Sequence, residues 1–356
     1  MIGTDFWRGK RVFLTGHTGF KGGWLALWLS DMGAEVFGYA LTPPTEPNLY
    51  SVLGLQGRLA ASKIADLRDA DGLKQALQAA SPDVVLHLAA QPLVRYSYAA
   101  PVETYMVNVM GTVNLFEAVR MTPGIKAVVN VTTDKCYENR EWVWPYRENE
   151  PMGGFDPYSS SKACAELVTS AYRNSFLASA GVRLASARAG NVIGGGDWAG
   201  DRLIPDFLRS LDIGEDLTIR SPGATRPWQH VLEPLSGYLL LAERLFVDGA
   251  DYAEAWNFGP ESADARPVRW IVEYLCSQLP NASWRCDATP QPHEANSLQL
   301  DSANAKARLG WLPRWNLETA LQMTLDWHQA WRQGDDMSAY SLQQILAYQT
   351  AAAEPA

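Results

Sequence analysis

Four cysteines in 356 residues are few, and their spacing narrows the kinds of site that the chain can carry. Cys136, Cys164, Cys276 and Cys286 form no C-x-x-C motif, so nothing indicates a metal centre or a dithiol redox pair. Long apolar runs are also missing. None approaches the roughly 20 residues that cross a bilayer, and the N-terminal residues lack the basic and then apolar layout of a signal peptide. We therefore expect a cytoplasmic protein with reduced thiols, no metal and no membrane partner.

Positive charge is scarce as well. Thirty Lys and Arg against 39 Asp and Glu give a net charge of -9, which argues against a general nucleic-acid-binding surface. A ligand that carries phosphates must therefore be held by a few placed arginines against an unfavourable overall field. The length permits one large domain or two closely joined ones, and we find no internal repeat.

A glycine-rich turn between a strand and a helix lies near the start of the chain. Residues 11–14 are typical of a strand, residues 16–22 have the spacing G-x-x-G-x-x-G, and a helical pattern then runs to Gly33. Glycine in such a turn lets backbone N–H groups approach a pyrophosphate at the helix N-terminus. The context predicts a dinucleotide site, and a tight turn without a ligand is the alternative.

Two features of this unit depart from the usual dinucleotide-binding pattern. His17 puts an imidazole where a small residue would let a cofactor lie closer, so it either weakens cofactor binding or points away. The second strand, residues 35–41, ends without the acid that holds an adenosine ribose 2′-hydroxyl and without an arginine for a 2′-phosphate. This position therefore does not decide between NAD and NADP.

Strands alternate with helices through the first half of the chain. Strands are predicted to end at residues 64–67 and to span 83–90, 127–131 and 183–189, with helices over 69–80, 102–120 and 158–180. This alternation predicts an α/β fold, a doubly wound parallel sheet of Rossmann type with its ligand at the carboxyl ends of the strands.

The pattern changes after Gly190, which suggests a second, smaller α/β domain. We assign residues 1–189 to a dinucleotide-binding domain, to which 228–258 return, and residues 190–227 and 259–350 to a substrate-binding domain. Closing helices are predicted over residues 301–311 and 317–331, and the last dozen residues are expected to form a frayed tail.

The candidate catalytic residues lie in the segment from Asn130 to Lys162. Asp156 and Pro157 suit the cap and first position of a helix on which Tyr158 and Lys162, four residues apart, share a face. A lysine ammonium favours the phenolate, so we expect the pKa of Tyr158 to fall by roughly 1–3 from about 10. An exposed helix face is the alternative, but Thr132 precedes at a strand end, where the site should lie.

Three arginines suit phosphate binding. Arg202, Arg220 and Arg226 fall in loops or at the ends of elements, where guanidinium groups can bind phosphate oxygens in bidentate fashion. Each taken alone can equally be a surface charge.

Five sequence blocks carry a family resemblance: residues 16–22 (GHTGFKG), 88–91 (LAAQ), 132–135 (TTDK), 158–162 (YSSSK), and Asp301 with 306–311 (KARLGW). In this order the blocks resemble those of the nucleotide-sugar 4,6-dehydratases of the extended short-chain dehydrogenase/reductase family. Residues 90–95, 108–113 and 133–137 are most similar to the members that act on CDP-glucose. Lys135 marks this subgroup, because the members acting on dTDP-glucose or GDP-mannose have a glutamate there.

The resemblance implies NAD-dependent conversion of CDP-glucose to CDP-4-keto-6-deoxyglucose for the deoxysugars of a bacterial O-antigen. Tyr158 would take the proton of the sugar 4-hydroxyl while hydride leaves C4 for NAD. Lys162 would hold the phenolate and the nicotinamide ribose, and Thr133 would bind the same hydroxyl. Asp134 would protonate the departing 6-hydroxyl. Lys135, made neutral by burial or by a neighbouring cation, would remove the C5 proton.

The resemblance also implies the remaining site residues and the oligomeric state. Cofactor contacts are expected from Gly16, His17, Thr18, Gly19, Phe20, Lys21, Asp66, Leu67, Ala89, Ala90, Gln91, Thr132, Tyr158 and Lys162. Substrate contacts are expected from Asn191, Arg202, Leu203, Arg220, Arg226 and His293. Pairing of helices 102–120 and 158–180 between subunits would give a homodimer or a dimer of dimers.

Two other functions stay open at this point. A 4-epimerase or another nucleotide-sugar dehydratase would use the same Tyr158 and Lys162. An epimerase has no need of Asp134 and Lys135. The alternative for these two residues is a structural salt bridge within a turn. A dinucleotide-sensing regulator without catalysis would not need an intact Tyr158 and Lys162 pair.

Overall fold

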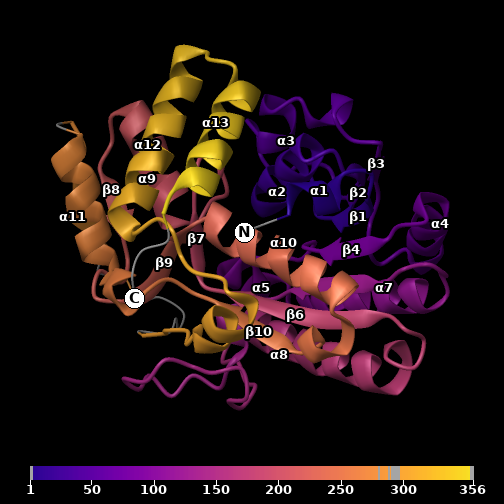
Figure 1. Ribbon diagram of the computed structural model, residues 1–356. Helices are drawn as coiled ribbons and strands as arrows, with labels where there is room; N and C mark the ends of the chain where they lie inside the picture. The colour runs from indigo at the N-terminus through magenta and orange to yellow at the C-terminus, as the bar shows by residue number, and fades with distance from the viewer. Residues whose placement is uncertain (1–2, 280, 288, 290–296, 353–356) are drawn as a thin grey trace.

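The computed structural model describes residues 3–279, 281–287, 289 and 297–352. Its centre is a seven-stranded parallel sheet in the order β10-β6-β5-β4-β1-β2-β3 (Figure 1). The strands are β1 (Arg11–Thr15), β2 (Glu35–Ala40), β3 (Ala61–Ile64), β4 (Val84–His87), β5 (Ala127–Val131), β6 (Arg183–Ala189) and β10 (Ala255–Phe258). The predicted doubly wound α/β fold of Rossmann type is confirmed.

Helices cover both faces of the sheet because successive residues of each strand point to opposite sides. In β1, Val12 and Leu14 are buried in one hydrophobic core and Phe13 in the other. The first core includes residues of α2 (Phe20–Asp31), α10 (Leu232–Val247) and α13 (Met337–Thr350), and the second includes residues of α4 (Ala70–Ala80), α7 (Gly111–Arg120) and α8 (Pro157–Tyr172).

The direction of winding reverses at β1. Strands β2 and β3 lie on one side of it, and β4, β5 and β6 lie on the other. The carboxyl ends of strands on either side of such a switch point are where sheets of this kind bind their ligands. The glycine turn after β1, the loop after β4 and the turn after β5 therefore all meet at this edge.

Both long helices that the sequence predicts contain a π-helical segment. Residues 101–120 form α6 (Pro101–Tyr105), η2 (Met106–Met110) and α7, and α8 continues into η4 (Arg173–Leu177). Single π turns inside α-helices are rare and often mark functional positions. Here η2 contains Asn108, whose buried amide faces the loop after β4.

A smaller lobe follows β6. It contains the three-stranded sheet β11-β9-β7, the two-stranded sheet β12-β8 and a separate hydrophobic core. Its elements are β7 (Asn191–Ile193), α9 (Leu203–Ile213), β8 (Leu217–Ile219), β9 (Thr225–His230), β11 (Ala265–Pro267), α11 (Val268–Gln278), β12 (Trp284–Cys286) and α12 (Leu317–Gln333). The π-helical segment η7 (Ala305–Leu309) instead packs on the core of the main sheet, beside α10 and β10. Short connecting helices elsewhere are α1 (Thr4–Trp7), α3 (Leu49–Val52), η1 (Leu55–Gly57), α5 (Val94–Ala99), η3 (Asp134–Cys136), η5 (Gly249–Tyr252) and η6 (Ser262–Asp264).

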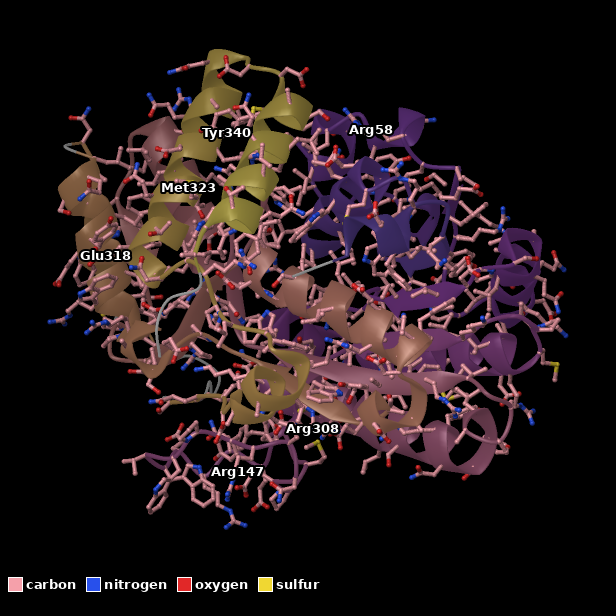
Figure 2. The ribbon with its side chains drawn as sticks, viewed as in Figure 1. Arg58, Arg147, Arg308, Glu318, Met323 and Tyr340 are labelled. Atoms are coloured by element: carbon pink, nitrogen blue, oxygen red, sulfur yellow. The ribbon has the colours of Figure 1, made fainter. Side chains whose placement is uncertain are left out.

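The expectation of a frayed tail over the last dozen residues is wrong as far as Thr350. Asp336 caps α13 by accepting hydrogen bonds from the N–H groups of Ser338 and Ala339, and the helix runs to Thr350. Figure 2 shows α13, with Tyr340, beside α12, with Met323. Tyr348 is 1% exposed and donates a hydrogen bond to Glu233 of α10 over 2.8 Å. The tail is helical because it buries apolar surface against α2, α10 and α12.

A smaller correction concerns the third strand. The structure ends β3 at Ile64, and residues 65–67 lead out of the sheet instead of completing it. Tyr39 donates a hydrogen bond to the carbonyl oxygen of Asp66, so the backbone leaving β3 is held to the end of β2.

Glu233 gives the fold a pH dependence. Its carboxyl accepts hydrogen bonds from the backbone N–H groups of Arg314 and Trp315, but burial raises its pKa from about 4.5 to about 7. The folded protein thus binds this proton more tightly than the unfolded chain. The resulting stabilisation is complete below about pH 4.5 and is lost as the pH rises through about 7.

We expect Glu233→Gln to flatten this dependence. Relative to the variant, the free energy of unfolding of the native protein should fall by on the order of 2 kcal/mol between pH 5 and pH 8. Urea denaturation at the two pH values measures the difference. Glu318→Gln, which changes an exposed carboxylate of α12, should keep the native pH dependence, and an equal slope for Glu233→Gln would contradict the assignment.

Candidate active site

The start of α8 places Tyr158 and Lys162 at the carboxyl edge of the sheet. Asp156 accepts hydrogen bonds from the backbone N–H and the hydroxyl of Ser159, and Pro157 takes the first helical position, as the sequence indicates. Tyr158 and Lys162 are both buried, and the Lys162 Nζ donates to the carbonyl oxygen of Val131, the last residue of β5, over 3.4 Å. The alternative of an exposed helix face is therefore excluded.

The turn that follows β5 carries the other predicted catalytic groups. Thr133, the N-cap of the short helix η3, donates through Oγ to Asp134 Oδ1 over 2.9 Å and accepts from the N–H of Lys135. The Thr133 hydroxyl also hydrogen-bonds the Tyr158 side chain. The structure thus brings together Thr133, Asp134 and Tyr158, and it places half-buried Lys135 on the same turn.

The expected lowering of the Tyr158 pKa is wrong. Burial raises the pKa of this phenol to about 12, and its hydrogen bond with Thr133 opposes the rise only in part. Burial also lowers the pKa of Lys162 to about 8, although the Glu166 carboxylate opposes this shift. The predicted fall of the Tyr158 pKa rests on the neighbouring cation alone, whereas the removal of both groups from water disfavours the charged form of each.

Asp134 is suited to donate a proton. The carboxyl group is 2% exposed, and its burial raises its pKa against the opposing effect of Lys135. Within the described part of the chain, its Oδ2 has no hydrogen-bond partner. The backbone at Gly190 packs close to this carboxyl, since a Cβ there would lie 3.2 Å from Asp134 Oδ2 and 2.5 Å from Pro227 Cγ.

The glycine turn has the close packing that a pyrophosphate-binding loop requires. Gly16 has a φ of 81°, and a Cβ on Gly22 would lie 2.0 Å from the carbonyl oxygen of Gly16. Gly19 is the N-cap of α2, and Phe20 and Lys21 form its first turn with their backbone N–H groups at the start of the helix. Thr18, next in the turn, donates to the carbonyl oxygen of Leu41.

Lys21 connects this turn to the catalytic residues. Burial lowers the pKa of Lys21 to about 8, and the positive charges of Arg202 and Lys162 lower it further, whereas Asp134 and Asp197 act in the opposite direction. The glycine turn and the catalytic residues are therefore close enough for their charges to influence one another.

His17 points away from the turn. Its imidazole hydrogen-bonds Ser62 Oγ through Nε2 over 2.7 Å and packs at Gly38, where a Cβ would lie 2.5 Å from the ring. Burial lowers the pKa of His17 to about 4, so the ring is neutral at physiological pH. Of the two alternatives left by the sequence, this geometry favours an imidazole that fills space behind the turn.

The other predicted cofactor contacts lie along the same edge. Asp66 forms an ion pair with Arg68, and Leu67 is buried in the core beneath α7. Ala89, Ala90 and Gln91 follow β4, and Thr132 follows β5.

Asn108 is a site residue to which the sequence pattern assigns no role. Its side chain accepts from the N–H of Gln91 and donates to the Gln91 carbonyl oxygen and to Ser161 Oγ, three residues beyond Tyr158. It thereby ties the loop after β4 to α8. An asparagine in the middle of a helical pattern is the signal that could have found it, because asparagine is a poor helix former.

The predicted arginines occupy different depths. Arg226 of β9 is buried and lies close enough to Asp134 to lower its pKa. Arg202, at the N-cap of α9, forms a 2.7 Å ion pair with Asp197, and the Tyr158 phenol contributes to the rise of its pKa. Arg220 forms a 2.8 Å ion pair with Asp201 farther out. Arg202 and Arg226 therefore lie close enough to the catalytic residues to act on them electrostatically.

Three predicted substrate contacts remain. Asn191 begins β7, immediately after Gly190 at the end of β6, and Leu203 packs at the edge of the small-lobe core. His293 lies outside the described residues. Within the described ranges, no helix has the length and apolar character needed to span a membrane.

Comparison with known proteins agrees with this geometry. The model of the family described as GDP-mannose 4,6 dehydratase matches residues 13–324. The chain is 56% identical over 357 aligned positions to CDP-glucose 4,6-dehydratase of Salmonella typhimurium (strain LT2), covering 99% of both. It is 27% identical to dTDP-glucose 4,6-dehydratase of Xanthomonas campestris pv. campestris, covering 94% of this chain and 98% of that protein.

Solved structures share the fold. A double mutant of the dTDP-glucose 4,6-dehydratase DesIV from Streptomyces venezuelae, with NAD and DAU bound, has a TM-score of 0.77 at 24% identity and covers 92% of this chain and 99% of that one. UDP-glucose 4-epimerase from Thermotoga maritima, with UDP-glucose, has a TM-score of 0.77 at 22% identity, covering 91% and 99%. The chain therefore belongs to the GDP-mannose 4,6 dehydratase family and is an enzyme, a hydro-lyase of the nucleotide-sugar 4,6-dehydratase class.

Proposed function

We propose that this enzyme converts CDP-glucose to CDP-4-keto-6-deoxyglucose, with NAD as a cofactor that is regenerated in each turnover. The observation that carries the proposal is the buried Asp134 carboxyl, one residue from Thr133 and with an oxygen that has no hydrogen-bond partner in the described structure. An epimerase needs no such acid beside its tyrosine. CDP-glucose is supported by the identity to the Salmonella enzyme and by Lys135.

The residues would act in sequence on the glucose unit. Tyr158, hydrogen-bonded to Thr133, would take the 4-hydroxyl proton as C4 is oxidised, and the Lys162 ammonium would stabilise the phenolate. The 4-keto group makes the C5 hydrogen acidic, so that Lys135 can remove it while Asp134 protonates the departing 6-hydroxyl. Water is thereby lost across C5 and C6. Reduction at C6 completes the reaction, and Arg202, Arg220 and Arg226 would hold the diphosphate.

The glycine turn fits the pyrophosphate of a dinucleotide. The backbone of Gly16 and Gly22 is packed without room for side chains, and α2 begins next to it, with Gly19 as its N-cap. Ala89 and Ala90 leave space at the end of β4 for a flat ring, and Lys162 would contact the nicotinamide ribose. NAD, when bound, supplies the hydride acceptor for the first step and the donor for the last.

We expect Gly22→Ala to weaken NAD binding at least about tenfold, since its Cβ would have to displace the Gly16 carbonyl that shapes the loop. Isothermal titration calorimetry with NAD measures the change. Gly57→Ala, where no atom lies within 4 Å of the added Cβ, is the matched control. Equal affinities for both variants would contradict placement of the pyrophosphate at this turn.

Lys135 provides a test of the elimination step. Lys135→Met should leave C4 oxidation possible and slow removal of the C5 proton by about 100-fold or more. Exchange of the C5 hydrogen with deuterated solvent, followed by mass spectrometry, reports on that proton alone. Exchange at the native rate would assign the base to another residue.

Larger-scale features support further parts of the proposal. The small lobe would bind the nucleotide sugar, and the sheet domain, including β10, would bind NAD.

Exposed apolar side chains lie on α5, α6, η2 and α8, and this surface suits pairing of these helices in a homodimer. These side chains include Tyr98, Val102, Tyr105, Met106, Met110 and Leu167. The product would enter deoxysugar synthesis for a bacterial O-antigen in the cytoplasm.

The proposal is tested by incubating the enzyme with NAD and CDP-glucose, with dTDP-glucose, UDP-glucose and GDP-mannose in parallel. The alkali-sensitive absorbance of a 4-keto sugar and a product mass lower by one water are expected with CDP-glucose alone. Product from another nucleotide sugar would keep the chemistry and change the substrate. A 4-epimer without loss of water would favour the epimerase, and no transformation of any of the nucleotide sugars would favour a sensor.

A further inference from the structure

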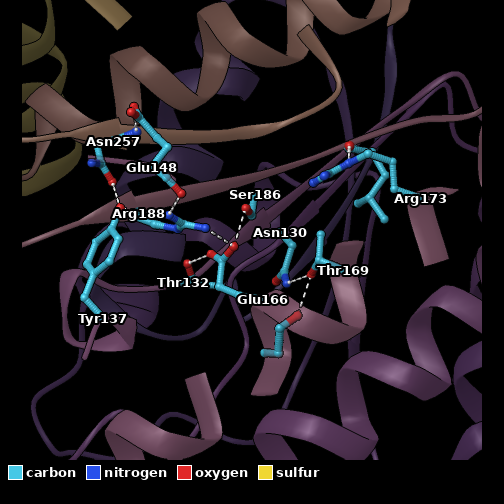
Figure 3. A network of polar contacts seen from close by, with 12 residues as sticks. Asn130, Thr132, Tyr137, Glu148, Glu166, Thr169, Arg173, Ser186, Arg188 and Asn257 are labelled. Carbon is cyan, nitrogen blue, oxygen red and sulfur yellow. Dashed lines mark hydrogen bonds and ion pairs between the residues drawn. The ribbon is translucent and has the colours of Figure 1, made fainter. Parts of the chain in front are cut away.

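A buried ion pair lies directly behind the catalytic turn. Glu166, one helical turn beyond Lys162 on α8, and Arg188 of β6 have side chains that are each 4% exposed, and Arg188 Nη2 donates to Glu166 Oε2 over 2.7 Å. Figure 3 shows the pair at the centre of a network that joins α8, β5 and β6. None of the catalytic steps above requires either residue.

Glu166 holds the start of the turn. Its Oε1 accepts the hydroxyl hydrogen of Thr132, the residue immediately before Thr133, and its Oε2 accepts from Ser186 of β6 over 2.7 Å. Both oxygens of this carboxylate are thus engaged, one of them by the strand end from which the turn departs.

Arg188 holds the other end of the turn. Its Nη1 donates to the hydroxyl of Tyr137 over 2.8 Å and to the carbonyl oxygen of Glu148 over 3.0 Å. Tyr137 directly follows η3 and is fully buried, and its hydroxyl donates to Asn257 Oδ1 over 2.7 Å. Asn257 in turn donates to the carbonyl oxygens of Tyr146 and Asp301, which fixes this end to β10.

The ion pair contributes little to the free energy of folding, because the desolvation of two charges offsets most of their attraction. An apolar pair of similar size is often as stable. What the ion pair does supply is fixed geometry at two points of one short turn. We infer that Glu166 and Arg188 are positioning residues that hold Thr132 and Tyr137, and with them Thr133, Asp134 and Lys135, in register with Tyr158 and Lys162. This inference rests on the proposed function for its kinetic consequence only.

Tyr137→Phe is the variant that tests this. Removing one partner of the ion pair would leave a buried charge unpaired and endanger the fold. Tyr137→Phe instead removes only the hydroxyl, and Arg188 keeps its bonds to Glu166 and to Glu148. Thr169→Val is the matched control, because Thr169 is equally buried, lies on α8 and accepts a hydrogen bond from Asn130 of β5, but does not contact the turn (Figure 3).

Two readouts are compared in the two variants. Hydrogen exchange of the backbone amides of residues 133–137, followed by mass spectrometry, should be at least about tenfold faster in Tyr137→Phe than in Thr169→Val. In turnover with CDP-glucose, Tyr137→Phe should slow water loss about tenfold more than C4 oxidation, so that NADH absorbance accumulates on the enzyme.

The outcomes separate this inference from the proposed function. If the native enzyme transforms no nucleotide sugar, the proposed function fails and hydrogen exchange alone decides about positioning. Equal exchange at the turn in both variants would overturn the inference. So would slowing of C4 oxidation and water loss by the same factor in Tyr137→Phe, since a merely structural role predicts that result.

Discussion

Tyr158→Phe is expected to lower the rate of C4 oxidation by about 1,000-fold, within the range of 10² to 10⁴ that proton transfer by a positioned side chain contributes. The phenylalanine keeps the ring that is buried at the start of α8 but cannot take the 4-hydroxyl proton. Because oxidation comes first, no NADH absorbance should appear after mixing with CDP-glucose, which stopped-flow spectroscopy measures directly.

The control for this variant lies on the same helix. Tyr172→Phe, at the other end of α8, removes a hydroxyl that donates to Glu117 of α7, and it should retain nearly native oxidation. The pH dependence adds a second check. With the Tyr158 pKa raised to about 12 by burial, the rate of oxidation in the native enzyme should rise with pH as the phenolate becomes accessible. A loss below about tenfold in Tyr158→Phe would show that another group takes the proton.

Asp134→Asn is expected to separate the two halves of the reaction. The amide oxygen still accepts the hydrogen bond of Thr133, so the turn should keep its shape, but an amide cannot donate a proton to the departing 6-hydroxyl. C4 oxidation should persist while water loss falls by about 100-fold to 10,000-fold. Enzyme-bound NADH and a 4-keto sugar that keeps its 6-hydroxyl should accumulate.

A nearby carboxylate provides the comparison. Glu138, just past the turn, is exposed and forms an ion pair with Arg140, so Glu138→Gln should behave as the native enzyme. Mass spectrometry of the quenched sugar distinguishes the oxidised intermediate from the final product. Native yields of the 6-deoxy product from Asp134→Asn would remove Asp134 from the role of acid.

The central sheet and much of the site could be predicted from local patterns. Five-residue apolar runs such as Ala127–Val131 and the glycine turn carry their information within a few neighbours. The same holds for the caps of α8, where Asp156 and Pro157 lie next to the helix that they begin. Tyr158 and Lys162 could be paired because a helix places residues four apart on one face.

What could not be predicted depends on partners far along the chain. Strands β7 and β11 are three residues long and pair with β9, so no local periodicity identifies them. Helix α13 is held through Tyr348 by Glu233, 115 residues earlier. Predicting the pKa of Tyr158 depends on knowing that the side chain is buried. Predicting the ion pair between Glu166 and Arg188 depends on knowing that α8 packs against β6. The position of Glu166, four residues after Lys162, was the only local sign of it.

The packing of His17 against Gly38 has an evolutionary consequence. The imidazole occupies the space that any side chain at position 38 would need, so the two positions share one small volume. A lineage that replaces Gly38 by a larger residue must first lose the imidazole, and one that gains the imidazole must already have glycine at position 38. Substitutions at these two sites should therefore occur in a fixed order, and related chains should rarely combine histidine at one with a bulky residue at the other.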